Sequence, residues 1–150
     1  MDGINVLALV AAGIAGATMA TQGKLNSQLS KDLGLFGATF VVHLLATIIL
    51  AVLVLIAGIE RGNLAGIAKV KWYTLLGGPL SIVIIYSVAY SLGKVSTAAG
   101  TTGIIVLQLL TAALIDHLGI LGAERLPFTP AKALAVALIG VGARILLMSK

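Results

Sequence analysis

The side chains that could take part in chemistry are uncharged polar groups placed inside long apolar stretches. Thr18, Gln22 and Asn26 follow one another at intervals of four residues, so a helix would carry all three on one face. Carboxamide groups offer both hydrogen-bond donors and acceptors, and such a face could bind a polar solute. The same side chains could instead hydrogen-bond neighbouring helices, and the sequence leaves both interpretations open.

Two further side chains could exchange a proton or bind an ion. His43 lies within an apolar stretch, and histidine is the side chain whose charge changes most readily near neutral pH. Asp116 follows a long uncharged stretch, where a membrane boundary is expected. Each has a simpler interpretation, because a single histidine is often a packing residue and a carboxylate is tolerated among lipid headgroups.

Aromatic and amide side chains in the later apolar stretches complete the set of candidates. Two tyrosines one helical turn apart could face a cationic or aromatic solute through their rings, or could pack between helices. The candidate solute-binding residues are Thr18, Gln22, Asn26, His43, Tyr86, Tyr90 and Gln108. The candidates for ion or proton coupling are His43 and Asp116.

Several classes of function are excluded by what the sequence lacks. It contains no cysteine and two histidines, and no nucleophile, phosphate-loop or zinc-protease motif is present. We therefore expect no enzymatic activity, no cofactor and no metal site. The ten basic residues that give the net charge of +5 are scattered singly, so the charge does not predict nucleic-acid binding.

The elements that must position these side chains are transmembrane helices. Of the 150 residues, 59% are hydrophobic and 10% are charged, and uncharged stretches reach the roughly 20 residues that cross a bilayer. Arg144 interrupts the last stretch but is close enough to the C-terminus to reach the headgroups. We predict one all-α membrane domain over residues 1–150, with five helices at about residues 4–28, 35–57, 72–93, 96–116 and 131–148.

The basic residues bear on how these helices are oriented in the membrane. With five crossings the termini lie on opposite sides, and each side carries five Lys or Arg residues. The N-terminal side has Arg61, Lys69, Lys71, Arg125 and Lys132, and the other side has Lys24, Lys31, Lys94, Arg144 and Lys150. Because orientation follows the Lys/Arg difference between sides, we infer insertion in both orientations. A short chain can also balance by chance, and the count depends on the fifth crossing.

Short motifs spread over nearly the whole chain point to a known family. They are Gln22, Asn26 and Leu29; Gly77-Gly78-Pro79; Gln108; Asp116-His117-Leu118-Gly119; and Gly140 with Gly142. With these motifs the sequence resembles the YdcZ-like family of small bacterial inner-membrane proteins, in the drug/metabolite transporter superfamily. Full-length members of that superfamily contain ten helices in two inverted halves. The resemblance implies that this chain is one five-helix half of such an inverted-repeat transporter.

The resemblance also implies a partner and a mechanism. An antiparallel homodimer, or a pair with a similar subunit, would rebuild the inverted repeat on which alternating access depends. Related four-helix multidrug exporters use a glutamate in their first helix for proton coupling, and this sequence has no acid between Asp2 and Asp32. That mechanism therefore does not carry over to this chain.

The predicted function is secondary transport across the bacterial inner membrane. We expect a multi-pass exporter of a small metabolite or amphipathic compound, working as an antiparallel dimer in the lipid bilayer. Two other classes remain open from the sequence: a dual-topology ion channel, and a non-catalytic membrane partner of a larger protein. Saturable flux with countertransport would distinguish a transporter from a channel.

Overall fold

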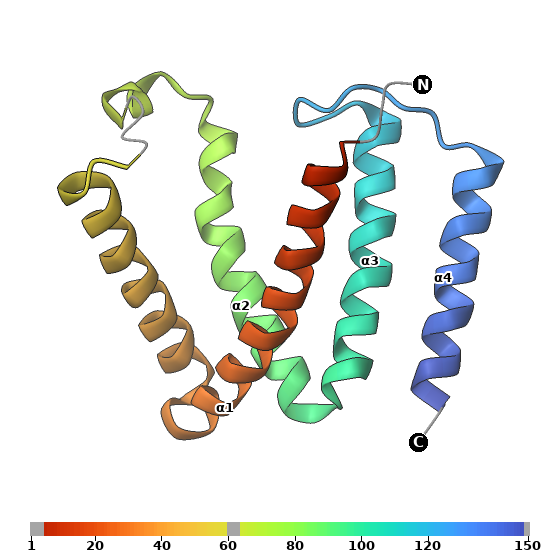
Figure 1. Ribbon diagram of the computed structural model, residues 1–150, viewed down its shortest axis with the longest axis horizontal. Coiled ribbons are helices and arrows are strands. Elements are labelled where there is room, and N and C mark those ends of the chain that lie inside the picture. The colour runs from red at the N-terminus through yellow and green to blue at the C-terminus, as the bar shows by residue number, and fades with distance from the viewer. Residues whose placement is uncertain (1–4, 60–63, 149–150) are drawn as a thin grey trace. The chain divides into compact units, whose positions relative to one another are not determined.

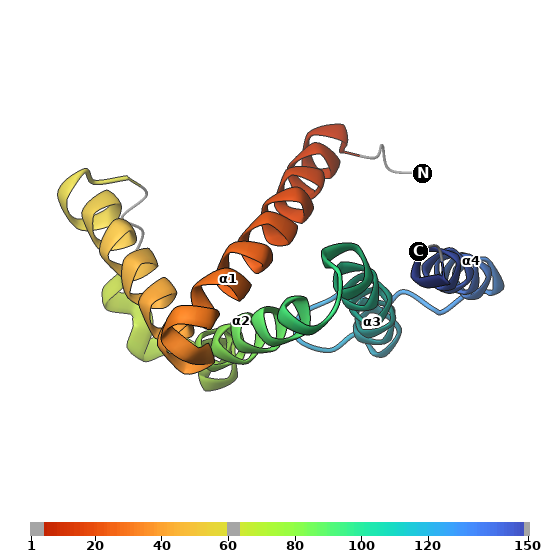
Figure 2. The ribbon, with the colours of Figure 1, turned by 90° about the horizontal axis from the view of Figure 1, so that it is seen from below.

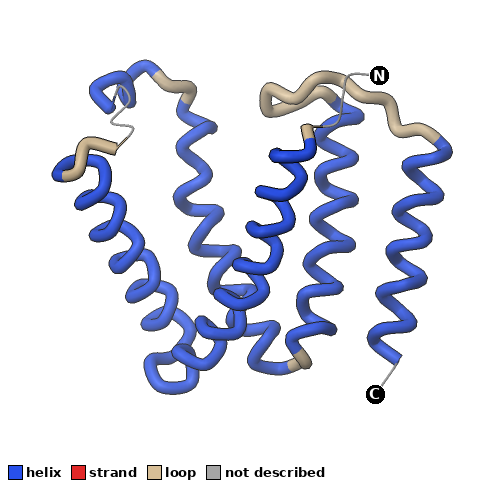
Figure 3. The backbone as a smooth tube through the Cα atoms, in the orientation of Figure 1, coloured by secondary structure: helices blue, strands red, loops and turns tan. Residues whose placement is uncertain are grey.

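The computed structural model describes residues 5–59 and 64–148, and the regular structure in these residues is helical (Figures 1 and 3). The long helices are α1 (Val6–Ala51), α2 (Gly77–Lys94), α3 (Thr97–Leu118) and α4 (Pro130–Met148). Short helical segments are η1 (Val52–Ile56), η2 (Leu64–Lys69) and η3 (Trp72–Leu76). Residue 4, where the first helix was expected to begin, and Arg61 and Lys150 of the charge count lie outside the described residues.

Four helical segments of the described chain are long and apolar enough to cross a membrane. They are Val6–Ile56, Trp72–Lys94, Thr97–Leu118 and Pro130–Met148. The all-helical membrane fold is thus confirmed. The first segment covers the two stretches for which separate helices were predicted, so the number of crossings stays a prediction.

The α1 helix is broken in the middle at Gly34. Its backbone there has φ 72° and ψ 165°, while the residues on both sides are helical. This combination is accessible essentially only to glycine, because a Cβ would collide with the neighbouring peptide groups. Figures 1 and 2 show the consequence: α1 consists of two arms that diverge from this turn. We call residues 6–33 the first arm and residues 35–51 the second arm.

The first arm packs closely against α2. Gly23 is buried, and a Cβ placed on it would lie 2.7 Å from Val88 Cγ1 and 2.9 Å from Leu92 Cδ1. One turn further on, Ser27 is 1% exposed, and Leu92 on α2 is 2% exposed. Small side chains on α1 therefore allow the two backbones to approach, which is how helices associate in lipid without a hydrophobic driving force.

The start of α2 follows from its glycines and proline. The 3₁₀-helical segment η3 runs directly into α2 at Gly77, and Pro79 is the third residue of α2. Proline is tolerated in the first helical turn, because its missing N–H has no intrahelical partner there. The motif Gly77-Gly78-Pro79 thus marks a change of helix type within one apolar segment.

Residues from Val95 onward form a second compact unit, separate from the unit that ends at Lys94. In it, α3 and α4 pack against each other. Ser96 caps α3 by accepting a hydrogen bond from the Ala99 N–H at 3.2 Å, and Gly119 ends α3 in the left-handed conformation at φ 63°. α4 begins at Pro130 after Thr129, whose Oγ1 accepts from the Lys132 N–H at 3.3 Å.

Very few apolar side chains are buried inside the chain. The buried hydrophobic residues of the described chain are Ala38, Ala89 and Leu92, whereas large apolar side chains are exposed along all four long helices. In the most apolar windows of α3 and α4, 0% of the residues are buried. Water would not tolerate such a surface, so lipid or protein must cover it.

The break in α1 gives a first testable prediction. Gly34→Ala places a Cβ in a backbone conformation that alanine adopts at a cost of about 1–3 kcal/mol. We expect a lower melting temperature of the detergent-purified protein. Gly16→Ala is the matched control, because nothing lies within 4 Å of a Cβ there and alanine favours a helix. Equal melting temperatures for both variants would contradict the glycine requirement at the turn.

Candidate functional site

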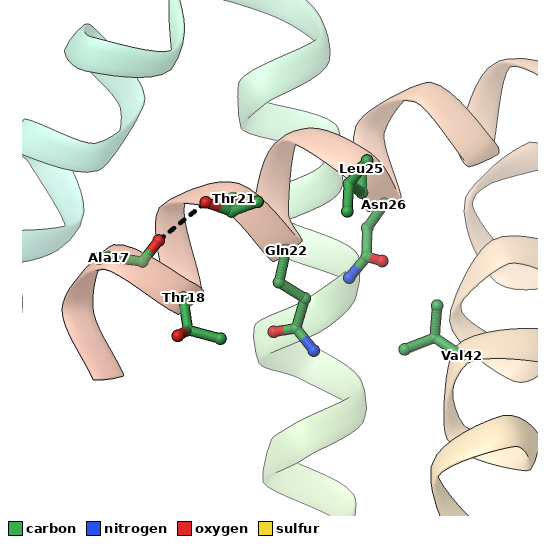
Figure 4. Close-up of a pocket in the computed structure, with 7 residues that line it drawn as sticks. All are labelled: Ala17, Thr18, Thr21, Gln22, Leu25, Asn26 and Val42. Carbon is green, nitrogen blue, oxygen red and sulfur yellow. Dashed lines mark hydrogen bonds between the residues drawn. The ribbon is translucent and has the colours of Figure 1, made fainter. Parts of the chain in front are cut away.

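A pocket of about 400 Å³ opens beside the first arm of α1 (Figure 4). Its lining residues are Ala17, Thr18, Thr21, Gln22, Leu25, Asn26 and Val42. All but Val42 come from the first arm, and Val42 comes from the second arm. The break at Gly34 therefore brings together residues that a straight helix would hold far apart. The volume lies within the range of about 300–1,000 Å³ that is typical of small-molecule pockets.

The three polar residues predicted from their four-residue spacing line this pocket together. Figure 4 shows the side chains of Thr18, Gln22 and Asn26 on the same side of the first arm, as a helical repeat requires. Asn26 is 6% exposed, and its side chain makes no hydrogen bond within the described chain. No buried polar atom of the described residues is both sealed and unpartnered, so the Asn26 amide is reached from the pocket.

The hydroxyl groups of the pocket are already committed as donors. Thr18 Oγ1 donates to the Ile14 carbonyl at 2.8 Å, and Thr21 Oγ1 donates to the Ala17 carbonyl at 3.0 Å. Each hydroxyl oxygen keeps its lone pairs and can still accept a hydrogen bond. The Gln22 amide makes no hydrogen bond within the described residues. The pocket therefore presents two free amides and two acceptor oxygens.

His43 lies on the second arm and connects it to α2. Its Nδ1 lies 2.8 Å from the Thr39 carbonyl, and its Nε2 lies 2.9 Å from Ser81 Oγ. A carbonyl oxygen can only accept, so Nδ1 carries a hydrogen and donates it to Thr39. The ring is half-buried and lies next in sequence to Val42 of the pocket, although it does not line the pocket itself.

The hydrogen atom of Ser81 has two competing acceptors. Ser81 Oγ also lies 2.7 Å from the Gly78 carbonyl, which can only accept. With a neutral imidazole, the Ser81 hydroxyl can donate to Nε2 or to Gly78, but not to both. With a protonated ring, Nε2 donates to Ser81 and Ser81 donates to Gly78. The Ser81 hydroxyl thus connects the His43 ring to the Gly78 carbonyl in the first turn of α2.

The two tyrosines of α2 have different surroundings. The Tyr86 ring packs against Phe36 of the second arm, with centroids 4.9 Å apart and planes tilted by 45°. Tyr90 is 53% exposed. Tyr86 therefore helps to hold α2 against α1, while the Tyr90 ring remains available on the outside of this unit.

The remaining predicted residues lie on α3 in the second unit. Gln108 is exposed in the middle of α3, and Asp116 is half-buried near its end. The backbone after Asp116 is tied to the following loop: the Asp116 carbonyl accepts from the Leu126 N–H at 2.8 Å. His117 Nδ1 accepts from the Phe128 N–H at 3.2 Å, so His117 anchors the loop to the end of α3.

Sequence reasoning missed several residues of the site. Thr21 and Leu25 form a second row beside the predicted stripe, and the helical repeat could have identified them. Val42 and Ser81 had no comparable signal, because each meets its neighbours only after the chain has turned back. Among the described residues, no group of three or more His, Asp or Glu side chains could hold a metal ion.

Comparison with known proteins identifies the family. Residues 7–145 match the family model described as "Putative inner membrane exporter, YdcZ". The chain belongs to the YdcZ family. No curated protein and no solved structure matches it.

Membership confirms the predicted resemblance, because the match covers nearly the whole chain. Together with four membrane-length apolar helical segments, it establishes a multi-pass inner membrane protein of an exporter family. All the candidate residues lie inside the matched range, and three of them, Thr18, Gln22 and Asn26, share one pocket.

The contact between His43 and Ser81 gives the second prediction. Ser81→Ala removes a hydrogen bond between the second arm and α2, which is worth about 0.5–1.5 kcal/mol. We expect a lower melting temperature. We also expect His43→Ala to lower the melting temperature by less in the Ser81→Ala background than in the wild type, because the shared hydrogen bond is already lost. Ser87→Ala is the matched control, since this exposed serine of α2 makes no hydrogen bond through its side chain within the described residues. Strict additivity of the two changes would contradict the contact.

Proposed function

We propose that this YdcZ-family chain is one half of a secondary exporter that moves small metabolites or amphipathic compounds by alternating access. The observation that carries the proposal is the pocket on α1, where the nearly buried Asn26 amide has no hydrogen-bond partner. An unpaired buried amide costs about 1–3 kcal/mol, and a bound solute would recover that free energy. Such a group in a membrane helix is characteristic of a solute site.

The length of α1 supports five membrane crossings in the proposed exporter. The continuous helical segment Val6–Ile56 has 51 residues. At 1.5 Å per residue it would extend about 77 Å if straight, more than twice the roughly 30 Å of hydrocarbon. The break at Gly34 divides it into residues 6–33 and residues 35–56, each long enough for one crossing. With α2, α3 and α4 the proposed total is five.

Five crossings and balanced flanking charges support an antiparallel pair. An odd number of crossings puts the two ends of the chain on opposite sides, and an even distribution of Lys and Arg gives no preferred orientation. Two copies of opposite orientation would form an inverted repeat, which supplies the two related states that alternating access needs. The exposed apolar faces of all four long helices offer surface for this pairing.

Coupling to a proton or ion is part of the proposal. His43 joins the second arm to α2 through Ser81, and the direction of the Ser81 hydrogen depends on the charge of the ring. A proton taken up or released at His43 would therefore change the contact between these helices. Asp116 remains a second candidate for ion coupling, at the end of α3.

Export can be tested without knowing the substrate. Cells that express the wild-type chain are expected to accumulate one or more small molecules in the medium, as measured by untargeted mass spectrometry. Asn26→Leu should lower this accumulation about fivefold or more, because the pocket loses a hydrogen-bonding group. Gln28→Leu on the same helix is the matched control, since Gln28 is exposed and does not line the pocket.

Two outcomes would overturn the export proposal. One is an unchanged medium on expression of a membrane-inserted wild-type chain. The other is an equal effect of Asn26→Leu and Gln28→Leu. A flux through reconstituted protein that never saturates and shows no countertransport would favour the ion channel instead.

The paired orientation gives a separate prediction. The chain has no cysteine, so single cysteines report position without background. Ala65→Cys lies before α2 and Val95→Cys lies after it, on opposite sides of one crossing. In intact cells an impermeant maleimide should label about half of each variant, since both orientations are present.

Cross-linking then separates the two kinds of pair. In an antiparallel dimer, a reagent much shorter than the roughly 30 Å hydrocarbon core joins Ala65→Cys of one copy to Val95→Cys of the other. In a parallel dimer the same reagent joins Ala65→Cys to Ala65→Cys, or Val95→Cys to Val95→Cys. Complete labelling of one variant with none of the other, or only like-to-like products, would exclude the antiparallel pair.

A further inference from the structure

The pocket on α1 also carries information about the charge of its ligand. Its lining consists of two amides, two threonines and three apolar residues, and no charged side chain among the described residues belongs to it. Lys24 is two positions beyond Gln22, which turns it by about 200° around the helix axis. His43 bonds to Thr39 and Ser81 and does not line the pocket.

We propose that this pocket recognises an uncharged amphipathic solute that presents amide-like or hydroxyl donors together with acceptors. The inference rests on the proposed export function and specifies its substrate class. It follows from the matching of groups: the Gln22 and Asn26 amides each donate and accept, and the threonine oxygens accept. An ammonium or carboxylate would lose its hydration there and gain no counter-charge.

The apolar part of the lining selects for a second feature of the ligand. Ala17 and Leu25 lie on the first arm beside the polar row, and Val42 faces it from the second arm (Figure 4). A solute with a short hydrocarbon portion would cover these residues, while its polar groups reach Asn26. A fully polar solute would leave the apolar surface uncompensated, and a hydrocarbon would leave the Asn26 amide unpaired.

Three ligands that share the leucine side chain and differ in charge test this proposal: N-acetyl-leucinamide, leucinamide and N-acetyl-leucine. The first is neutral, the second is a cation and the third an anion at about pH 6, and all share one side chain. Binding to the full-length purified protein is measured by isothermal titration calorimetry. The neutral probe is expected to bind at least about tenfold more tightly than either charged analogue, because burial of an unpaired charge costs more than the amide contacts return.

A variant pair ties the selectivity to the pocket. Gln22→Leu is expected to weaken binding of N-acetyl-leucinamide about fivefold, through the loss of one amide. Gln28→Leu on the same helix is expected to leave it unchanged, since Gln28 does not line the pocket. Gln22 is exposed, so this variant keeps the test valid even where a change at the buried Asn26 disturbs folding.

The proposal is overturned if either charged analogue binds as tightly as the neutral probe, if Gln22→Leu and Gln28→Leu behave alike, or if none of the three probes binds. The export test detects charged and uncharged compounds in the medium alike. Export of a charged compound would therefore contradict the proposed ligand class but support the export function. Selective binding of the neutral probe without any export would support the ligand class but contradict the export function.

Discussion

The backbone conformation of one glycine, Gly34, determines how the two arms of α1 are placed relative to each other. Gly34 adopts φ 72° and ψ 165° inside a segment that is otherwise continuously helical. A straight helix would place Val42 about 12 Å beyond the level of Gly34 along the same axis. The turn instead directs the second arm away at an angle from the first (Figure 1), so that Val42 shares a pocket with Thr18 and Gln22 and His43 contacts Ser81 of α2. The pocket and the contact between His43 and Ser81 both depend on that turn.

The membrane sets the other condition under which this structure holds together. The helices satisfy their own backbone hydrogen bonds, so little internal packing is needed and few side chains are buried. Where α1 and α2 meet, the buried residues of α1 include the small Gly23 and Ser27, which lie against Leu92 and Gly93 of α2. In this setting a nearly buried polar side chain without a partner in the described chain is unusual, because its hydrogen-bonding groups are free to meet whatever enters the pocket. Asn26 is such a group, and it is reached from the pocket on α1 that the proposed export function uses.

Two sets of polar side chains lie on or beside α1 and differ in their hydrogen bonding. The pocket residues leave donors and acceptors unused, which suits reversible binding of a solute. His43, by contrast, bonds to Thr39 and Ser81 through both ring nitrogens, and a protonated ring would leave the Gly78 carbonyl as the acceptor for the Ser81 hydrogen. Val42 and His43 are consecutive residues of the second arm, so a movement of that arm relative to α2 would affect both sets. In the proposed exporter, this short helix would link solute binding at the pocket to proton exchange at His43.

The sequence by itself determined the membrane class, the family and the polar stripe of Thr18, Gln22 and Asn26. The length of an apolar stretch and the helical spacing of its polar residues depend only on residues that are close in the sequence, so tertiary contacts do not change them. The partners Val42, Ser81 and Phe36 were decided only by the tertiary structure. Each comes from a segment that approaches the site after the break at Gly34, and no spacing along the chain encodes how two diverging arms and α2 meet. Gly34 was visible in the sequence, but the backbone conformation that it adopts was not.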